Sequence, residues 1–159
     1  MTGTGMTEKT LIVSKIRNGT VIDHITGGHA LDVLRVLDVN GRDGEVLAIA
    51  INVPSRKLGV KDMVKFEGRE LESGEVDRIA LLAPKATINI VRDYDVVEKQ
   101  VVRLPKILKG IVKCVNPTCI SNSKEPIQST LYIKQEEPFY AKCHYCGHIM
   151  EKDELLKQF

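Results

Sequence analysis

The chain of 159 residues contains no tryptophan, few aromatic residues and no long apolar segment. Phenylalanine and tyrosine together make up only 4% of the residues, so the interior must be built from valine, isoleucine and leucine. The longest unbroken apolar run, Val46 to Ile51, has six residues. Because a helix needs about 20 apolar residues to cross a bilayer, we expect no membrane partner.

The sequence also lacks the patterns of common catalytic and nucleotide-binding sites. Neither G-x-x-x-x-G-K-[ST] nor G-x-G-x-x-G occurs, and no nucleophile–base pair or paired carboxylates stand out on one element. Residues 1–103 carry 15 basic and 15 acidic side chains, and residues 104–159 carry 8 and 6. The missing catalytic patterns predict that the chain is not an enzyme. The even charge and the few aromatic side chains available for base stacking predict no nucleic-acid partner.

Four cysteines, all in the last third of the chain, are its most informative feature. They are spaced as Cys114-x4-Cys119 and Cys143-x2-Cys146, with 23 residues between the pairs. Two short pairs separated by a hairpin-length segment can bring four thiolates to one point, which is the donor set of a structural zinc site. Four protein ligands leave no position for a catalytic water. We predict one structural zinc ion per chain.

Other uses of the cysteines remain open from the sequence alone. Two disulfides would suit an oxidising compartment, but residues 1–10 hold no apolar core of a secretory signal, so a cytoplasmic location is expected. A rubredoxin-type iron site would use the same four thiolates. A redox pair at Cys143 and Cys146 would leave the first two cysteines unexplained. His144 and His148 lie beside the second pair, and we expect both to stay outside the ligand set.

Alternation of apolar residues and helical spacing predict a split βαβ arrangement over the first two thirds of the chain. Helices are expected to start at Ala30, with about ten residues, and after an N-cap at Ser73. Asn18-Gly19 predicts a turn between the first two strands. Strands are predicted over residues 9–17, 21–25, 45–52, 62–67, 87–91 and 95–102. The expected fold is α+β: a ferredoxin-like antiparallel sheet with two helices on one face.

A second, small domain is predicted beyond Leu104-Pro105. Short strands over residues 107–114, 128–134, 139–143 and 148–150, with a terminal helix from about residue 152, indicate an all-β zinc-ribbon or rubredoxin-like domain. The predicted division is a disordered lead-in over residues 1–8, one domain over 9–103 and the zinc-binding domain over 104–159. A domain of about 55 residues buries little apolar surface, so a structural metal must supply folding free energy.

Four short stretches together resemble the regulatory chain of aspartate carbamoyltransferase. They are Gly19–Ile25, Asn52–Ser55, Ala83–Asn89 and the cysteine pattern, and the resemblance runs from about Lys9 to the C-terminus. Each stretch is weak alone, but their joint occurrence in this order is specific. The resemblance implies a non-catalytic, cytoplasmic subunit that binds CTP and ATP as allosteric effectors and controls de novo pyrimidine biosynthesis.

The resemblance also implies partners and an effector site. Regulatory chains pair as homodimers through their first domains and bridge two catalytic trimers, while the zinc domain contacts the catalytic chain; Asn116 and residues 120–126 are the expected interface. The implied effector-site residues are Val13, Ile16, Asp23, His24, Lys61, Lys65, Asn89, Tyr94, Val96 and Lys99.

The residue types agree in part with this implied site. A carboxylate suits sugar hydroxyls, and an imidazole and lysines suit phosphates. Ser14-Lys15 departs from the family pattern, which has an acidic and a small residue there. The competing hypothesis is a zinc-ribbon module that binds nucleic acid or a transcription complex, and a salt-dependent gel shift separates the two.

Overall fold

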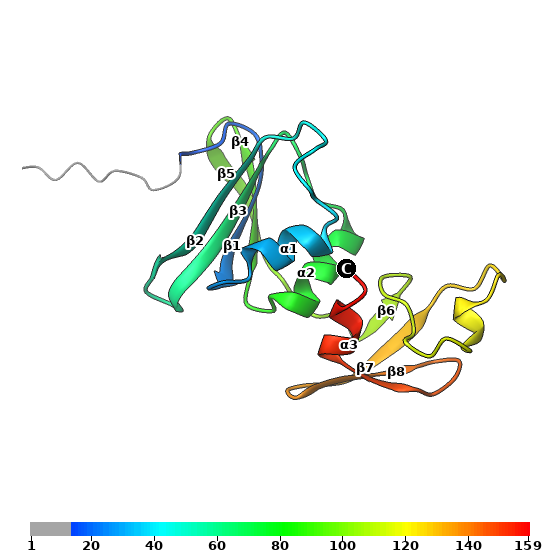
Figure 1. Ribbon diagram of the computed structural model, residues 1–159. Coiled ribbons are helices and arrows are strands. Elements are labelled where there is room, and N and C mark those ends of the chain that lie inside the picture. Colours follow the sequence, from blue (N-terminus) through cyan, green and yellow to red (C-terminus); the bar gives the residue numbers. More distant parts are fainter. Residues whose placement is uncertain (1–13) are drawn as a thin grey trace, which may run out of the picture.

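The computed structural model describes residues 14–159, which form two antiparallel β-sheets with helices between them (Figure 1). The first sheet has the strand order β2-β3-β1-β4-β5. Its strands are β1 (Gly19–Thr26), β2 (Leu47–Ser55), β3 (Gly59–Glu67), β4 (Thr87–Arg92) and β5 (Asp95–Val101). Helices α1 (Ala30–Val36) and α2 (Ser73–Leu82) cover one face of this sheet, and the predicted ferredoxin-like architecture is confirmed.

The core of the first half lies between the sheet and its two helices. Alternating residues of β3 point to opposite faces, so Val64 and Phe66 are fully buried, whereas Met63 and Lys65 lie on the helix-free face. Fully buried Val33 of α1 and Ile79 of α2 pack onto this layer. The helices therefore cover one face of the sheet, and within residues 14–159 the other face carries no helix.

The second sheet is small and has the order β6-β7-β8-β9. Its strands are β6 (Ile107–Lys109), β7 (Thr130–Glu136), β8 (Phe139–Cys143) and β9 (Ile149–Glu151), with a 3-10 helix η1 (Ile120–Asn122) and the terminal helix α3 (Lys152–Leu156). The all-β second part predicted from the sequence is confirmed. The strand predicted over residues 107–114 ends after Lys109, because the following residues leave the sheet to bring Cys114 to the other cysteines.

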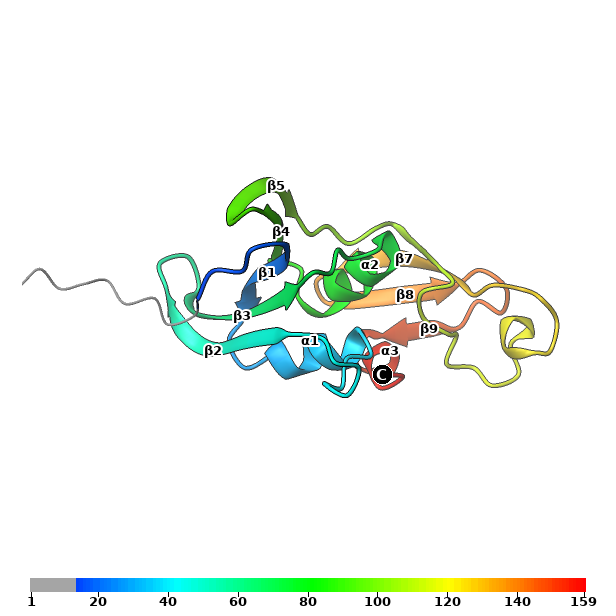
Figure 2. The same ribbon diagram turned by 90° about the horizontal axis from the view of Figure 1, so that it is seen from above.

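Helix α2 belongs to both halves of the molecule (Figure 2). Ile79 and Ala80 lie in the first core, whereas the next residue, Leu81, is buried with Leu108 and Leu155 in the second core. The guanidinium of Arg78 lies 5.7 Å from the centre of a C-terminal aromatic ring, that of Phe159. None of the helices in residues 14–159 combines the length and the apolar character needed to cross a membrane.

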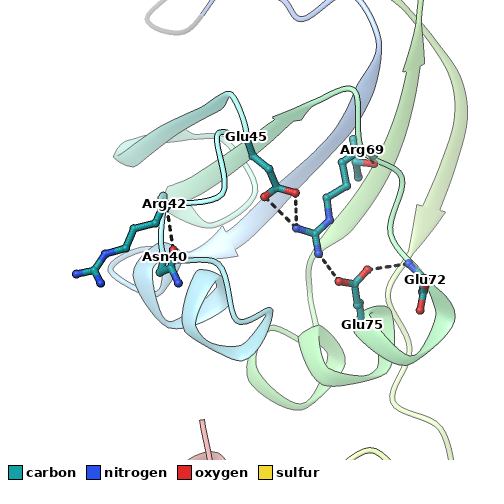
Figure 3. A network of polar contacts seen from close by, with 7 residues as sticks. Asn40, Arg42, Glu45, Arg69, Glu72 and Glu75 are labelled. Carbon is teal, nitrogen blue, oxygen red and sulfur yellow. Dashed lines mark hydrogen bonds and ion pairs between the residues drawn. The ribbon is translucent and has the colours of Figure 1, made fainter.

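Arg69 ties the loop before β2 to the start of α2 (Figure 3). Its Nη1 donates to both carboxylate oxygens of Glu45, at 3.0 and 3.1 Å, and its Nη2 donates to Glu75. Burial opposes the charge of Arg69, but the two carboxylates outweigh burial and raise its pKa. The network fixes the loop that leads into β2, which is an edge strand of the sheet.

Several element boundaries differ from the sequence predictions. No strand covers residues 14–18, and the turn predicted at Asn18-Gly19 is absent, since β1 begins at Gly19. Gly19 has φ +140°, and a Cβ there would lie 1.9 Å from the backbone oxygen of Phe66, so a close strand crossing explains this glycine. The predicted lead-in over residues 1–8 and the strand segment over 9–13 lie outside the described residues.

The helices and β2 also differ in extent. Helix α1 has seven residues rather than about ten. Helix α2 is capped by Glu72, not Ser73, because Glu72 and Glu75 form a reciprocal capping box. Strand β2 runs through Pro54-Ser55, which the sequence predicted as a loop. Proline is tolerated there because β2 is an edge strand with one side free of ladder hydrogen bonds.

Candidate metal centre and effector site

The four cysteines converge on one point of the second half. Their Sγ atoms all lie within 4.8 Å of one another, and none of the four is in a disulfide. The Sγ atoms of Cys114 and Cys146 are 3.6 Å apart, and those of Cys119 and Cys143 are 3.7 Å apart. Thiolates at about 2.3 Å from a tetrahedral zinc ion are about 3.8 Å from one another. The donor set therefore fits one tetrahedral divalent ion.

Local hydrogen-bond donors stabilise negative charge on this cluster. Burial raises the pKa of Cys114 and of Cys143, whereas the Ser121 hydroxyl lowers the pKa of Cys119. Desolvation opposes ionisation of Cys146 too, but donors led by the backbone N–H of His148 bring its pKa down to about 6. In each cysteine the backbone amide two residues further along acts in the acidifying direction. Such donors are the usual second layer around a thiolate-bound metal.

The loop between the first two cysteines is held in one conformation. Asn122 Nδ2 donates to the backbone oxygens of Cys114 and Asn116, both at 2.7 Å. His144 lies outside the cysteine cluster and its Nδ1 is 3.1 Å from the hydroxyl of Tyr132. His148 is exposed and also outside the cluster. The side chain of Ile120 remains half exposed beside this ordered loop.

On the first sheet, strand register aligns four residues across the helix-free face. Lys65 on β3 pairs with Val21 on β1, Val21 pairs with Asn89 on β4, and Asn89 pairs with Lys99 on β5. Residues paired in register lie on the same face of a sheet. Three predicted effector residues from three different strands therefore form one row, although the sequence separates them by up to 34 positions.

A cavity of about 380 Å³ lies beside this row. Six predicted effector residues line it: Ile16, Asp23, Lys65, Asn89, Tyr94 and Val96. Five lining residues were not predicted: Lys15, Val21, Met63, Val91 and Asp95. The period-two alternation of the strands could have identified Val21 and Met63 as facing the same way as Lys65. Larger hollows, of about 740 and 950 Å³, are lined by none of the predicted effector residues.

The other predicted effector residues lie beside the cavity or outside the described part. His24, Lys61 and Lys99 do not line it, and Val13 falls among the residues that the structure does not describe. Lys61 Nζ is 2.9 Å from the carboxylate of Asp23, which also accepts the backbone N–H of His24 at 2.6 Å. His24 sits in a bulge of β1 with φ +56°, and its Nδ1 is 3.1 Å from the Thr87 hydroxyl.

Burial and charge set the protonation of this site. Burial is the main cause that lowers the pKa of His24; Asp23 opposes it, and the ammonium groups of Lys61, Lys57 and Lys99 lower it further. Burial also lowers the pKa of Lys65, against the effect of Asp23, and Lys65 Nζ donates to the Ser14 oxygen at 2.9 Å. The site combines an apolar cavity, the carboxylates of Asp23 and Asp95, and several ammonium groups, which suits a ligand with a flat ring, hydroxyls and phosphates.

Comparison with known proteins identifies both halves of the chain. The family model described as the allosteric domain of the aspartate carbamoyltransferase regulatory chain matches residues 11–103. The model described as the metal binding domain of that chain matches residues 106–156. The chain belongs to the aspartate carbamoyltransferase regulatory chain family. Membership makes it a regulatory, non-catalytic subunit with an allosteric and a metal-binding domain.

Individual family members are similar over nearly the whole chain. The aspartate carbamoyltransferase regulatory chain of Staphylothermus marinus is 55% identical over 146 residues, which cover 91% of this chain and 89% of the relative. That of Methanothrix thermoacetophila is 54% identical over 141 residues, covering 89% and 92%. That of Thermofilum pendens is 50% identical over 152 residues, covering 95% and 96%. The family resemblance predicted from the short motifs is confirmed.

Proposed function

We propose that this chain senses nucleoside triphosphates, CTP and ATP, on the helix-free face of the first sheet, and that it thereby controls pyrimidine biosynthesis through a catalytic chain. The observation that carries the proposal is the row of Lys65, Asn89 and Lys99 beside a cavity lined by six predicted effector residues. In this assignment residues 9–103 form the effector domain and residues 104–159 form the zinc domain.

The residues that line the site indicate how a nucleotide would be oriented in it. Ile16, Tyr94 and Val96 offer apolar and aromatic surface for a base at one end of the cavity. Asp23 can accept hydrogen bonds from ribose hydroxyls. Lys99 lies in the row with Asn89, and His24 follows Asp23 toward the end of the sheet where β1 finishes; both would receive the phosphates.

Calorimetric titration of the full-length chain with CTP and ATP tests this site. Lys65→Ala and Lys99→Ala each remove one charge-assisted contact, so we expect each to weaken binding about tenfold. Lys109→Ala, an exposed lysine on the second sheet, controls for the loss of one positive charge. Unchanged affinity in both site variants would show that the site is elsewhere.

We further propose that the cysteine cluster holds one zinc ion and that the clamped second half binds the catalytic chain. When bound, the ion would cross-link Cys114, Cys119, Cys143 and Cys146 and neutralise their thiolates, with no open position for chemistry. Asn116 and the loop over residues 120–126, ordered through Asn122, supply the contact surface. Thiolate ligands require a reducing compartment, so we place the chain in the cytoplasm.

Co-purification tests the partner. Tagged regulatory chain is expected to retain the catalytic trimer of aspartate carbamoyltransferase, and a mercurial that titrates the thiolates should release it. A matched sample treated with the mercurial in the presence of excess zinc and thiol should keep the complex. Retention of the trimer after complete removal of the metal would contradict the assigned role of the cysteine cluster.

The edge of the first sheet is the proposed contact between two regulatory chains. Strand β2 is an edge strand, and its Ile49 and Ile51 are 40% and 46% exposed, respectively. Pairing of two such edges would bury these side chains and satisfy the free backbone groups. Light scattering should detect a dimer that Ile49→Lys converts to a monomer. Val97→Lys on the opposite edge strand is the matched control, and equal dimerisation of both variants would refute this assignment.

Such a dimer, with a catalytic trimer at each zinc domain, bridges two trimers. Effector binding then shifts the assembly only by its differential affinity for two arrangements of that assembly. A coupling free energy of about 1–3 kcal/mol is ordinary for such systems.

A further inference from the structure

We propose that Lys57, in the turn between β2 and β3, is a further phosphate-binding residue of the effector site that recognises the terminal phosphates of the ligand. The inference rests on the proposed nucleotide site and adds to it a residue that neither the sequence pattern nor the cavity lining had singled out. It assigns a function to the β2–β3 turn: discrimination by the length of the polyphosphate chain.

The β2–β3 turn has a defined position at one end of the sheet. Ser55 pairs with Gly59 across the hairpin, and the Ser55 hydroxyl accepts the backbone N–H of Leu58 at 3.2 Å. A Cβ on Gly27, which directly follows β1, would lie only 2.8 Å from a methyl carbon of Val60. The end of the hairpin therefore packs against the chain three residues after His24, at the end of the sheet where β1 finishes (Figure 1).

The charges at this end of the sheet are unbalanced. The ammonium groups of Lys57, Lys61 and Lys99 each lower the pKa of His24, so all three are close enough to act on its ring although they come from a turn and two strands. Lys61 is neutralised by Asp23 at 2.9 Å. Among the ion pairs formed within residues 14–159, none involves Lys57 or Lys99. An anion placed here gains two cations that give up no existing carboxylate partner.

The position of Lys57 along the sheet selects which phosphate it can reach. The cavity reaches along β1 as far as Asp23, and the strand runs on past His24 to Thr26, a further rise of about 10 Å at about 3.3 Å per residue. Lys57 lies beyond Lys61, at the far end of this path. When the base and ribose lie in the cavity, only the terminal phosphates of a triphosphate reach Lys57. The phosphate of a monophosphate is too close to the ribose to reach it.

Paired titrations of the full-length chain with CTP and CMP test this assignment. Lys57→Met keeps most of the side-chain length and removes the charge. We expect it to weaken CTP about five- to tenfold and to leave CMP unchanged, so that the preference for the triphosphate falls by that factor. Lys57→Arg should restore the preference, and Lys109→Met, which removes one distant positive charge, should not alter it.

The outcomes separate this proposal from the proposed function. If the unaltered chain binds neither CTP nor ATP, the nucleotide site itself is wrong. If it binds CTP and Lys57→Met leaves the ratio of CTP to CMP affinity unchanged, the site stands and the role of Lys57 is refuted. An equal loss for CTP and CMP would also refute it, because the variant would then act through the fold of the turn.

Discussion

The two halves of this chain hold their shapes by different means. Within residues 14–159 the first core contains 14 buried residues, all of them apolar side chains supplied by the first sheet, its two helices and the adjoining loops. In the same part of the chain the second core contains 10, of which three are cysteines of the cluster and one is Leu81, contributed by α2 of the first half. Without a metal and without α2, few purely apolar side chains of the second half remain to stabilise its sheet.

Under the proposed function, this difference separates the sensing of an effector from the contact with a partner. The first half is stabilised by packing on one face of its sheet, so the other face can carry lysines and a carboxylate at little cost to stability. The second half gathers its four cysteines at one point and is anchored on α2, and a metal bound there would give it a rigid surface for a partner. Helix α2 is the element that both cores share, so under the proposed function it is the physical connection between sensing and contact.

The largest expected effect comes from removing one cysteine of the cluster, which tests whether only the second half depends on it. Cys143→Ser should abolish stable metal binding and unfold the second sheet, because structural zinc contributes on the order of 10 kcal/mol to such domains. Metal analysis and amide hydrogen exchange read this out: β7 and β8 should lose protection, while β1 and β3 keep it. His148→Ala, next to the cluster but outside it, is the control. Protection of β7 in metal-free protein would contradict the comparison.

The shared helix offers a second, smaller test. Leu81→Ala opens a cavity in the second core, so we expect the stability of the second half to fall by about 2–5 kcal/mol. Ile79→Ala, two residues earlier on the same helix, should instead destabilise the first half. Hydrogen exchange of the β7 and β1 amides in the two variants shows which half each substitution destabilises. A loss confined to β1 in both variants would show that the second core does not depend on α2.

The sequence predicts much of the fold and the metal cluster, because both depend on local patterns. The spacing of the four cysteines and the alternation around Val64 and Phe66 each report a local geometry. The bulges of β1 and β2 are not predictable in this way. Fully buried Asp62 accepts the backbone N–H groups of Ala30, which begins α1, and of Asn52 in the β2 bulge, both at 2.8 Å, so the β2 bulge depends on a side chain of the neighbouring strand.

The effector site shows the same limit. Family resemblance predicted ten residues for this site, and strand register explains why Lys65, Asn89 and Lys99 meet on one face. Lys57 had no motif to mark it, and Lys15 was marked only as a departure from the family pattern. Lys15 is assigned by the cavity that it lines, and Lys57 by the cations gathered around His24. Such relations exist only once the strands are placed side by side.

The smallest expected effect concerns pH and only the first half. The pKa of His24 lies below its ordinary value of 6.5, mainly because the ring is buried and also because of Lys61, Lys57 and Lys99. The unfolded chain therefore binds a proton on His24 at a higher pH than the folded chain does. The stability that His24 contributes is complete above about pH 6.5 and is lost as the pH falls through its folded pKa.

Denaturant unfolding of the first half at pH 7.5 and 5.5 should show this loss, and the loss should be smaller in His24→Asn, a residue that tolerates the positive φ at this position. The difference between the two proteins isolates His24 from the carboxylates that titrate in both. A bound triphosphate should reduce the loss, because an anion beside the ring favours its protonated form. If the stability difference between the two proteins is the same at both pH values, the buried ring does not titrate as the geometry requires. The second half, whose stability depends on the cysteine cluster, should give the same result in both proteins.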